Sequence, residues 1–193
     1  MDIMSTIASL MLLFVVAGVV FYLVTIYNGL VTMRNEIDKS WANIDVLLKQ
    51  RHDELPRLVD VCRGYMQYER ETLQSLVEAR TRVGAATTID QKAQASSNLS
   101  ASVGRLFAVA ENYPALQANA AFLDLQKRTT ELESQIADRR EFYNDAINVF
   151  NTRIQEMPDI FVARLFGMRP RLMFLVTAAE KAPARLVFDS RQP

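Results

Sequence analysis

The chain has 193 residues, of which 22 are basic and 22 acidic, with a single histidine and a single cysteine. Because the charges balance, the chain offers no overall electrostatic attraction for nucleic acid, and we expect no nucleic-acid partner. One cysteine excludes an internal disulfide and a four-cysteine zinc site. Few glycines and prolines, together with many Ala, Leu, Glu, Gln and Arg residues, predict an all-α protein.

The N-terminal stretch Ile3–Tyr27 contains no charged residue, no histidine and no proline. A helix of this length rises about 36 Å and can cross a hydrocarbon core of about 30 Å. A cleaved signal peptide would have a basic start and a small-residue cleavage site, whereas this stretch follows Asp2 and has Phe21 and Tyr22 near its end. A buried core helix of this length is uncommon. We therefore predict that residues 1–29 form a single transmembrane anchor, whose membrane-spanning residues include Ile3, Leu10, Phe14, Gly18, Phe21 and Tyr27.

Basic residues flank the anchor on one side only, at Arg34 and Lys39. The positive-inside rule therefore favours an external N-terminus and a cytoplasmic bundle. The bias is two residues, so a periplasmic bundle is kept as the alternative. Asn28-Gly29 is the one interruption before the next helical pattern, and we expect a hinge there at the membrane surface.

From Ile37 to Val83, apolar or small residues recur every three or four positions. This repeat predicts one long helix, Leu30–Gly84, that packs against other helices. Pro56 removes one backbone hydrogen bond, so we expect a kink there while the apolar seam continues in register. Gly84 is predicted to end the helix in the left-handed conformation.

Two further helices are predicted to follow. The second begins at a Thr88 or Asp90 cap and ends before Pro114, and the third covers residues 119–157. Residues 30–158 are thus predicted to form a bundle of long helices. The side chains expected to line the helix-packing seams are Ile37, Trp41, Ile44, Leu48, Leu55, Leu58, Phe122, Leu125, Leu132, Ile136, Tyr143 and Phe150.

Residues 159–193 form a predicted short C-terminal tail, with six basic and three acidic side chains. Ile160–Phe166 is expected to be a short helix, broken by Gly167 and Pro170. Arginines interleaved with apolar residues suit docking at an anionic membrane surface. The alternative is a short element that closes the end of the bundle. The candidate membrane-surface contacts are Phe161, Arg164, Phe166, Arg169 and Arg171.

The sequence shows no catalytic or metal-binding pattern. His52 is the single histidine, and Glu54, two residues further along the helix, does not face the same way, so we expect no metal pair. Cys62 falls on the apolar seam, where cysteine behaves as a small hydrophobic residue. We predict no catalytic residue, no metal site and no cofactor. Four acidic residues of the third helix are interpreted as a solvated face, since no Glu-x-x-His motif accompanies them: Glu131, Glu133, Asp138 and Glu141.

Four polar residues stand at seam positions where apolar side chains are expected: Arg51, Glu69, Arg139 and Arg153. One interpretation is that they fix the register of the helices at some cost in stability. The other, which we favour at this stage, is that the seam turns to the surface at these points.

Three separated blocks of the chain resemble those of the LemA family, in the same order. The first block is Tyr27–Glu69, the second is AENYPALQANAAFLDLQ at Ala110–Gln126, and the third is FYNDAINVFNTRIQEMP at Phe142–Pro158. The resemblance implies a protein anchored in the bacterial inner membrane, with no established enzymatic activity. The implied fold is an N-terminal single transmembrane helix that continues into an elongated antiparallel, up-and-down helical bundle.

Two functions fit these expectations. The first is a non-enzymatic single-pass membrane protein whose bundle acts as an oligomerising scaffold at the membrane surface, with the lipid bilayer and further copies of itself as partners. The second is an adaptor or regulator that binds another membrane or envelope protein. An enzyme would need a converging polar site, which the sequence does not show.

Overall fold

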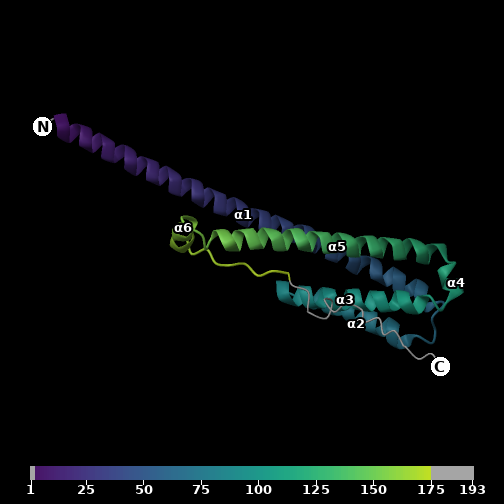
Figure 1. Ribbon diagram of the computed structural model, residues 1–193. Coiled ribbons are helices and arrows are strands. Elements are labelled where there is room, and N and C mark those ends of the chain that lie inside the picture. Colours follow the sequence, from purple (N-terminus) through teal and green to yellow (C-terminus); the bar gives the residue numbers. More distant parts are fainter. Residues whose placement is uncertain (1–2, 175–193) are drawn as a thin grey trace, which may run out of the picture. The chain divides into compact units, whose positions relative to one another are not determined.

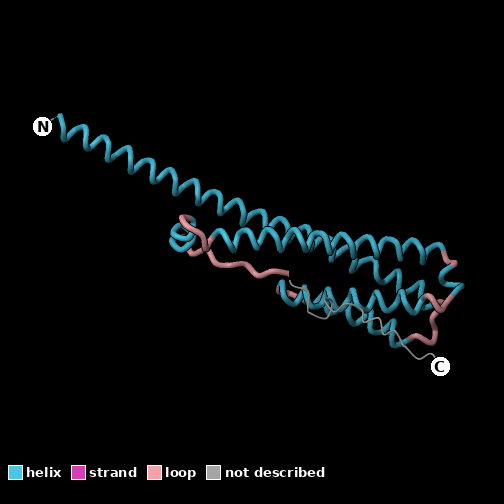
Figure 2. Tube along the Cα trace, viewed as in Figure 1, coloured by secondary structure: helices cyan, strands magenta, loops and turns pink. Residues whose placement is uncertain are grey.

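The computed structural model describes residues 3–174, and all regular elements in that range are α-helices (Figures 1 and 2). This confirms the predicted all-α class. The described part of the predicted tail ends at Phe174, and residues 175–193 lie outside it. The elements are α1 (Ile3–Arg63), α2 (Arg70–Ala85), α3 (Ile89–Ala110), α4 (Pro114–Gln117), α5 (Ala120–Arg153) and α6 (Asp159–Leu165).

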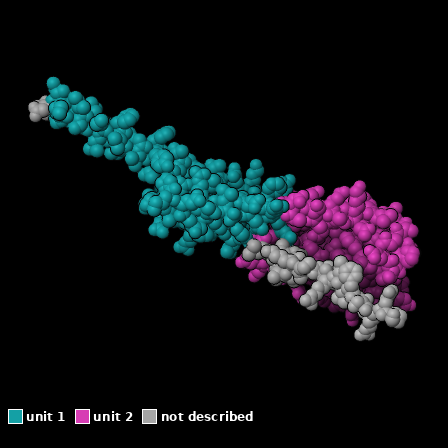
Figure 3. Space-filling view, in the orientation of Figure 1, with its two compact units in different colours: residues 1–43, 139–173 teal, residues 44–138, 174–193 magenta. Residues whose placement is uncertain are grey.

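The chain divides into two compact units, coloured separately in Figure 3. Of the described residues, unit 1 comprises 3–43 and 139–173, and unit 2 comprises 44–138 and 174. The helices α1 and α5 each contribute one part to either unit, whereas α2, α3 and α4 belong to unit 2 and α6 to unit 1.

Helix α1 has no break between its apolar N-terminal stretch and the positions that follow. The predicted hinge at Asn28-Gly29 is wrong, because both residues are helical. A glycine inside a helix costs about 1 kcal/mol relative to alanine, which tertiary packing readily outweighs. Ile26 and Leu30, which flank this position, are both buried. Pro56 also lies inside α1 without ending it.

The predicted single helix Leu30–Gly84 is in fact two helices. Helix α1 ends at Arg63, and the backbone N–H of Met66 donates to the Cys62 carbonyl at 2.8 Å as the chain turns. The second half of the apolar seam then folds back against the first half. Hydrophobic periodicity is the same for one long helix and for two shorter helices that face each other, so the pattern alone could not decide between them.

The start of α3 follows its sequence signal. Thr88 is the N-cap: its Oγ1 accepts the N–H of Gln91 at 3.2 Å, and the Gln91 side chain accepts the N–H of Thr88 at 3.3 Å. This reciprocal pair is a capping box. The predicted left-handed cap at Gly84 is wrong, because α2 continues to Ala85 and the following residue, Ala86, is extended.

Contacts within unit 2 define an up-and-down arrangement. The Arg80 Nε of α2 donates to the His52 carbonyl of α1 at 2.9 Å, whereas Arg63 at the end of α1 lines one pocket with Arg70 and Leu73 at the start of α2. Helix α3 contacts α5 at two places, through Ser100 and Glu133 at 2.7 Å and through the rings of Phe107 and Phe122 at 6.4 Å. The pairs α1–α2 and α3–α5 are therefore antiparallel in this unit.

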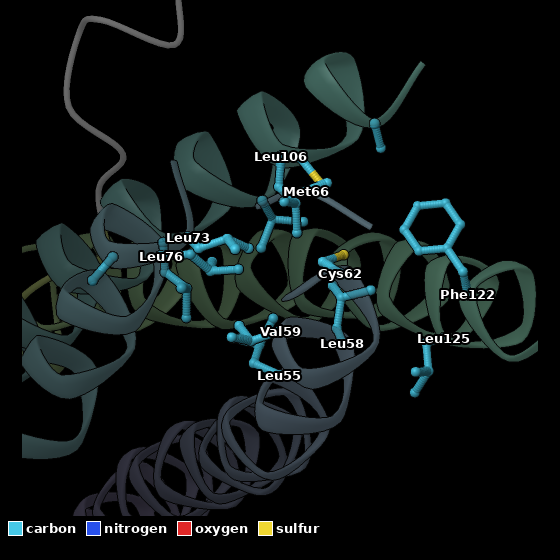
Figure 4. Close-up of a cluster of buried hydrophobic side chains, with 14 of the residues drawn as sticks. Leu55, Leu58, Val59, Cys62, Met66, Leu73, Leu76, Leu106, Phe122 and Leu125 are labelled. Carbon is cyan, nitrogen blue, oxygen red and sulfur yellow. The ribbon is translucent and has the colours of Figure 1, made fainter. Parts of the chain in front are cut away.

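A single hydrophobic cluster holds unit 2 together. Figure 4 shows that side chains of α1, α2, α3 and α5 gather in it. The labelled members are Leu55, Leu58, Val59, Cys62, Met66, Leu73, Leu76, Leu106, Phe122 and Leu125.

Replacing a leucine in this cluster should destabilise the protein much more than the same change at the surface. Leu58 is 0% exposed, whereas Leu123 is 46% exposed. We expect Leu58→Ala to lower the free energy of unfolding by about 2–5 kcal/mol through lost burial and a residual cavity. The matched change Leu123→Ala should cost less than about 1 kcal/mol. Denaturant unfolding of the full chain in detergent, followed by circular dichroism, measures both; equal losses would contradict the assignment of this core.

Candidate functional site

The first part of α1 presents an apolar surface that no other described residue covers. Residues 3–24 are exposed along the whole circumference of the helix, with Phe14 at 80%, and Figure 1 shows this stretch apart from the other elements of unit 1. Within the described chain, α1 is the one helix long and apolar enough to cross a membrane. Continuous exposure of large apolar side chains is unfavourable in water and favourable in lipid.

Hydroxyl groups in this stretch are satisfied locally. The Ser9 Oγ donates to the Ser5 carbonyl at 2.8 Å, and the Thr6 Oγ1 donates to the Ile3 carbonyl at 2.8 Å. Such bonds give each of these hydroxyl groups a partner within the helix, which matters where no water is available.

Of the predicted membrane-spanning residues, Ile3, Leu10, Phe14 and Phe21 are exposed, and Gly18 has no neighbour within 4 Å of the place a Cβ would occupy. Tyr27 differs, because it is half-buried and its ring lies 4.4 Å from that of Phe166. The fully exposed apolar surface of α1 therefore ends before Tyr27.

The predicted packing seams lie largely inside the two units. Trp41 and Leu132 are half-buried, and the Trp41 ring packs against Tyr143 of unit 1 at 5.6 Å. The other ten positions are buried: Ile37, Ile44, Leu48, Leu55, Leu58, Phe122, Leu125, Ile136, Tyr143 and Phe150.

Arg51 is the most buried charged side chain in the described chain, with 0% exposure. Its Nη1 donates to Glu133 Oε1 at 2.7 Å and to Ser100 Oγ at 3.0 Å, and its Nη2 donates to Ser96 Oγ at 2.8 Å. Ser100 in turn donates to Glu133 Oε2 at 2.7 Å. This Arg51 cluster joins α1, α3 and α5 within unit 2.

The Arg51 cluster corrects two sequence interpretations. The seam does not turn to the surface at Arg51, and Glu133 does not belong to a solvated face, because its side chain is 26% exposed and paired with Arg51. A buried guanidinium must find a partner, since an uncompensated charge inside a protein is costly. The small side chains of Ser96 and Ser100 leave room for the Arg51 head group and supply hydrogen-bond acceptors.

The other polar seam residues differ from one another. Arg139 is exposed, as the surface interpretation expected. Arg153 pairs with the buried carboxylate of Asp159 at the start of α6, and Glu69 accepts a hydrogen bond from Tyr113 at 3.1 Å. A seam position in the sequence does not tell whether a polar side chain is exposed or paired. That depends on whether a neighbouring segment supplies a hydrogen-bond or ion-pair partner.

His52 is half-buried, and its pKa is lowered because burial and the nearby Arg80 charge disfavour the imidazolium. The ring is therefore neutral at pH 7. Among the described residues, no three side chains of His, Cys, Asp or Glu converge as a metal site would require.

Cys62 is buried in the hydrophobic cluster, and burial raises the pKa of its thiol to about 11. The thiolate is the nucleophilic form of cysteine, and almost none of it exists at neutral pH with such a pKa.

The predicted tail begins with α6, which has two faces. Val162 and Ala163 are buried in unit 1, whereas Phe161, Arg164 and Phe166 are exposed. Arg169 is also exposed, and Arg171 is half-buried with its Nη2 3.4 Å from Asp38 Oδ1. The five candidate surface residues thus lie in α6 or directly after it, and three of them line one pocket of unit 1: Phe166, Arg169 and Arg171.

The model of the LemA family matches residues 40–188 of the chain. The chain belongs to the LemA family. This confirms the predicted family, and with the exposed apolar helix it indicates a membrane-associated protein.

The curated proteins that are similar to this LemA-family chain include magnetosome proteins called MamQ and a protein called LemA. The magnetosome protein MamQ 2 of Paramagnetospirillum magneticum is 24% identical over 197 residues, covering 87% of this chain and 72% of the relative. Protein LemA of Metamycoplasma hominis is 27% identical over 149 residues, covering 74% and 67%. The MamQ protein of Magnetospirillum gryphiswaldense is 22% identical over 189 residues, covering 83% and 70%.

Breaking the Arg51 cluster from the Glu133 side should destabilise unit 2 strongly. Glu133→Gln leaves the buried guanidinium without its counter-charge, and we expect a loss of about 2–4 kcal/mol. Arg51→Met should cost less, because Glu133 is partly exposed and can regain water. The double variant should cost less than the sum of the two, by about 1–3 kcal/mol.

Equilibrium unfolding of the four proteins of this cycle measures the coupling. Arg63→Met, which removes an exposed arginine 3.7 Å from Asp60, is the control and should leave stability unchanged. Strictly additive losses at Arg51 and Glu133 would show that the two side chains do not depend on each other.

The Cys62 thiol should resist alkylation in the folded protein. At pH 8 iodoacetamide should label it very slowly, because the thiol is both buried and protonated, and raising the pH toward 11 should accelerate labelling. In denaturant, labelling should proceed as for an ordinary cysteine. Mass spectrometry of the time course measures the rate, and fast labelling without denaturant would mean that Cys62 is accessible.

Proposed function

We propose that this LemA-family protein is a non-enzymatic, single-pass membrane scaffold that associates with further copies of itself at the membrane surface. The observation that carries the proposal is the unbroken course of α1 from its exposed apolar stretch into the packed part of unit 1. Because no loop separates the two, the anchor restricts how unit 1 can turn. When two anchored copies associate, they therefore lose less rotational freedom than two freely tumbling proteins would.

The buried seams are not the surfaces that would join copies, since the chain itself covers them. Within the membrane, the exposed stretch of α1 has Ala17 and Gly18, small residues that allow close approach of a second helix. Outside it, Phe142 and Val149 lie two turns apart on α5 in unit 1, and both are exposed. These two surfaces support self-association.

We include the absence of catalysis in this proposal. It is supported by the hydrogen-bond partners and protonation states of the buried polar groups. Arg51, the fully buried charge of the described chain, is engaged with Ser96, Ser100 and Glu133 inside the helical core. Cys62 is protonated, and the His52 Nδ1 has no hydrogen-bond partner among the described residues that would orient the ring as a base. Groups in these states support a structural role more than a chemical one.

For the orientation, we propose an external N-terminus and a cytoplasmic bundle in the bacterial inner membrane. Arg34 and Lys39, the basic residues after the apolar stretch, support this side.

Cross-linking in native membranes tests the scaffold. Membranes that contain the full chain, treated with an amine-reactive cross-linker, should give dimers and larger species. Phe142→Lys with Val149→Lys should reduce them at least severalfold, because two charges would enter the proposed contact. Val46→Lys, an exposed apolar position in unit 2, is the control and should leave the pattern unchanged.

Monomer alone at every cross-linker concentration would count against the scaffold. Recovery of one other membrane protein in constant proportion, without self-association, would instead support the adaptor alternative.

A further inference from the structure

A pocket lies in unit 1 at the point where the lipid-exposed surface of α1 ends. Val24 is 49% exposed, whereas Ile26 is 5% and Leu30 is 0% exposed, so protein covers α1 from Ile26 onward. The pocket has a volume of about 380 Å³ and begins at Tyr27, the residue directly after Ile26. Its position along α1 is thus the level at which a spanning helix meets the head groups.

A helix-ending turn shapes the pocket wall. Gly167 has a φ of +63°, its N–H donates to the Arg164 carbonyl at 3.2 Å, and the N–H of Met168 donates to the Ala163 carbonyl at 2.8 Å. These bonds form a Schellman motif, in which the left-handed residue reverses the chain after a helix. The reversal carries residues 166–171 along the pocket.

The pocket is lined by three arginines and by no carboxylate. Arg34 comes from α1, and Arg169 and Arg171 come from the segment after the turn. Asn151 holds the backbone of Arg171 by two hydrogen bonds, of 2.8 and 2.9 Å, and Asp38 lies 3.4 Å from its guanidinium. Arg34 and Arg169 are exposed, and neither forms an ion pair within residues 3–174.

Aromatic and apolar side chains stand next to these charges. The Tyr27 and Phe166 rings contact each other at 4.4 Å, and Phe161 and Leu165 of α6 are exposed. Aromatic rings and arginine stems that combine apolar surface with polar ends are typical of the membrane–water boundary.

We propose that this pocket binds the phosphate head group of an anionic phospholipid from the adjacent leaflet. The guanidinium groups of Arg34 and Arg169 donate charge-assisted hydrogen bonds to the phosphate oxygens. Arg171, which is paired with Asp38 and held at its backbone by Asn151, forms part of the wall. The acyl chains lie along the exposed apolar surface of α1 that ends at Val24. The inference rests on the membrane anchoring in the proposed function and is independent of self-association.

Native mass spectrometry of the full chain in detergent tests the site. The protein is offered equal amounts of phosphatidylglycerol and phosphatidylcholine with the same acyl chains, and the ratio of retained lipids is measured. The wild type should retain phosphatidylglycerol preferentially. R34Q/R169Q should reduce that preference about 25-fold, at about fivefold for each arginine near an anionic surface.

Two matched variants separate the pocket from net charge and from folding. R82Q/R105Q makes the same change in charge at two exposed arginines of α2 and α3, and it should retain the wild-type preference. R34K/R169K keeps both positive charges, so its preference for phosphatidylglycerol should stay within about threefold of the wild-type preference. An unchanged preference in R34Q/R169Q would overturn the proposal, as would an equal loss in R34K/R169K or in R82Q/R105Q.

A competition arm distinguishes a lipid from a soluble anion. Glycerol phosphate at the concentration of the lipid should leave phosphatidylglycerol bound; complete displacement would show a soluble-phosphate site and refute the lipid assignment. Carbonate extraction of membranes tests the anchor by itself. Release of the wild type into the soluble fraction would refute anchoring, whereas equal retention of both lipids by a protein that stays in the membrane would refute the head-group site alone.

Discussion

Helix α1 runs without a break from a fully exposed apolar stretch into the packed part of unit 1, and the rest of this unit depends on that continuity. Inside a helix the backbone hydrogen bonds are made within the segment, so only the roles of the side chains change along α1. In α1 the change from exposed to buried side chains occurs within two residues, from Val24 to Ile26. The end of α5, the whole of α6 and the turn at Gly167 all belong to the unit in which this transition lies.

In unit 2 the corresponding constraint is the burial of Arg51. Apolar seams tolerate a slip of one turn, because leucines and valines pack acceptably against many neighbours. A guanidinium does not, since a slip of one turn would separate it from Glu133 and leave a charge inside the protein. The Arg51 cluster therefore selects one register among several that the hydrophobic cluster alone would accept. The register role considered from the sequence stays a prediction, for which Arg51 is now the candidate among the four positions.

The sequence predicted the helical class, the family, a cap at Thr88 or Asp90 (Thr88 in the structure) and the helix boundary at Pro114, because each depends on local chemistry or on a pattern within one segment. It failed at Gly64, where the apolar repeat continues although the chain reverses. It also could not distinguish Arg51 from Arg139, which occupy equivalent seam positions. Serines at positions 96 and 100, spaced one turn apart, are the signal that was missed, because small polar residues opposite a buried arginine provide both space and acceptors.

The two interpretations of the tail, closing element or membrane contact, were treated as alternatives because Pro170 forbids one continuous amphipathic helix. The structure removes the conflict. A seven-residue helix is long enough to have a buried face, with Val162 and Ala163, and an exposed face, with Phe161 and Leu165. After it, the chain reverses in a Schellman turn at Gly167, and this reversal lets Arg169 and Arg171 line a pocket together with Arg34 of α1. Closing unit 1 is thus what assembles the basic pocket.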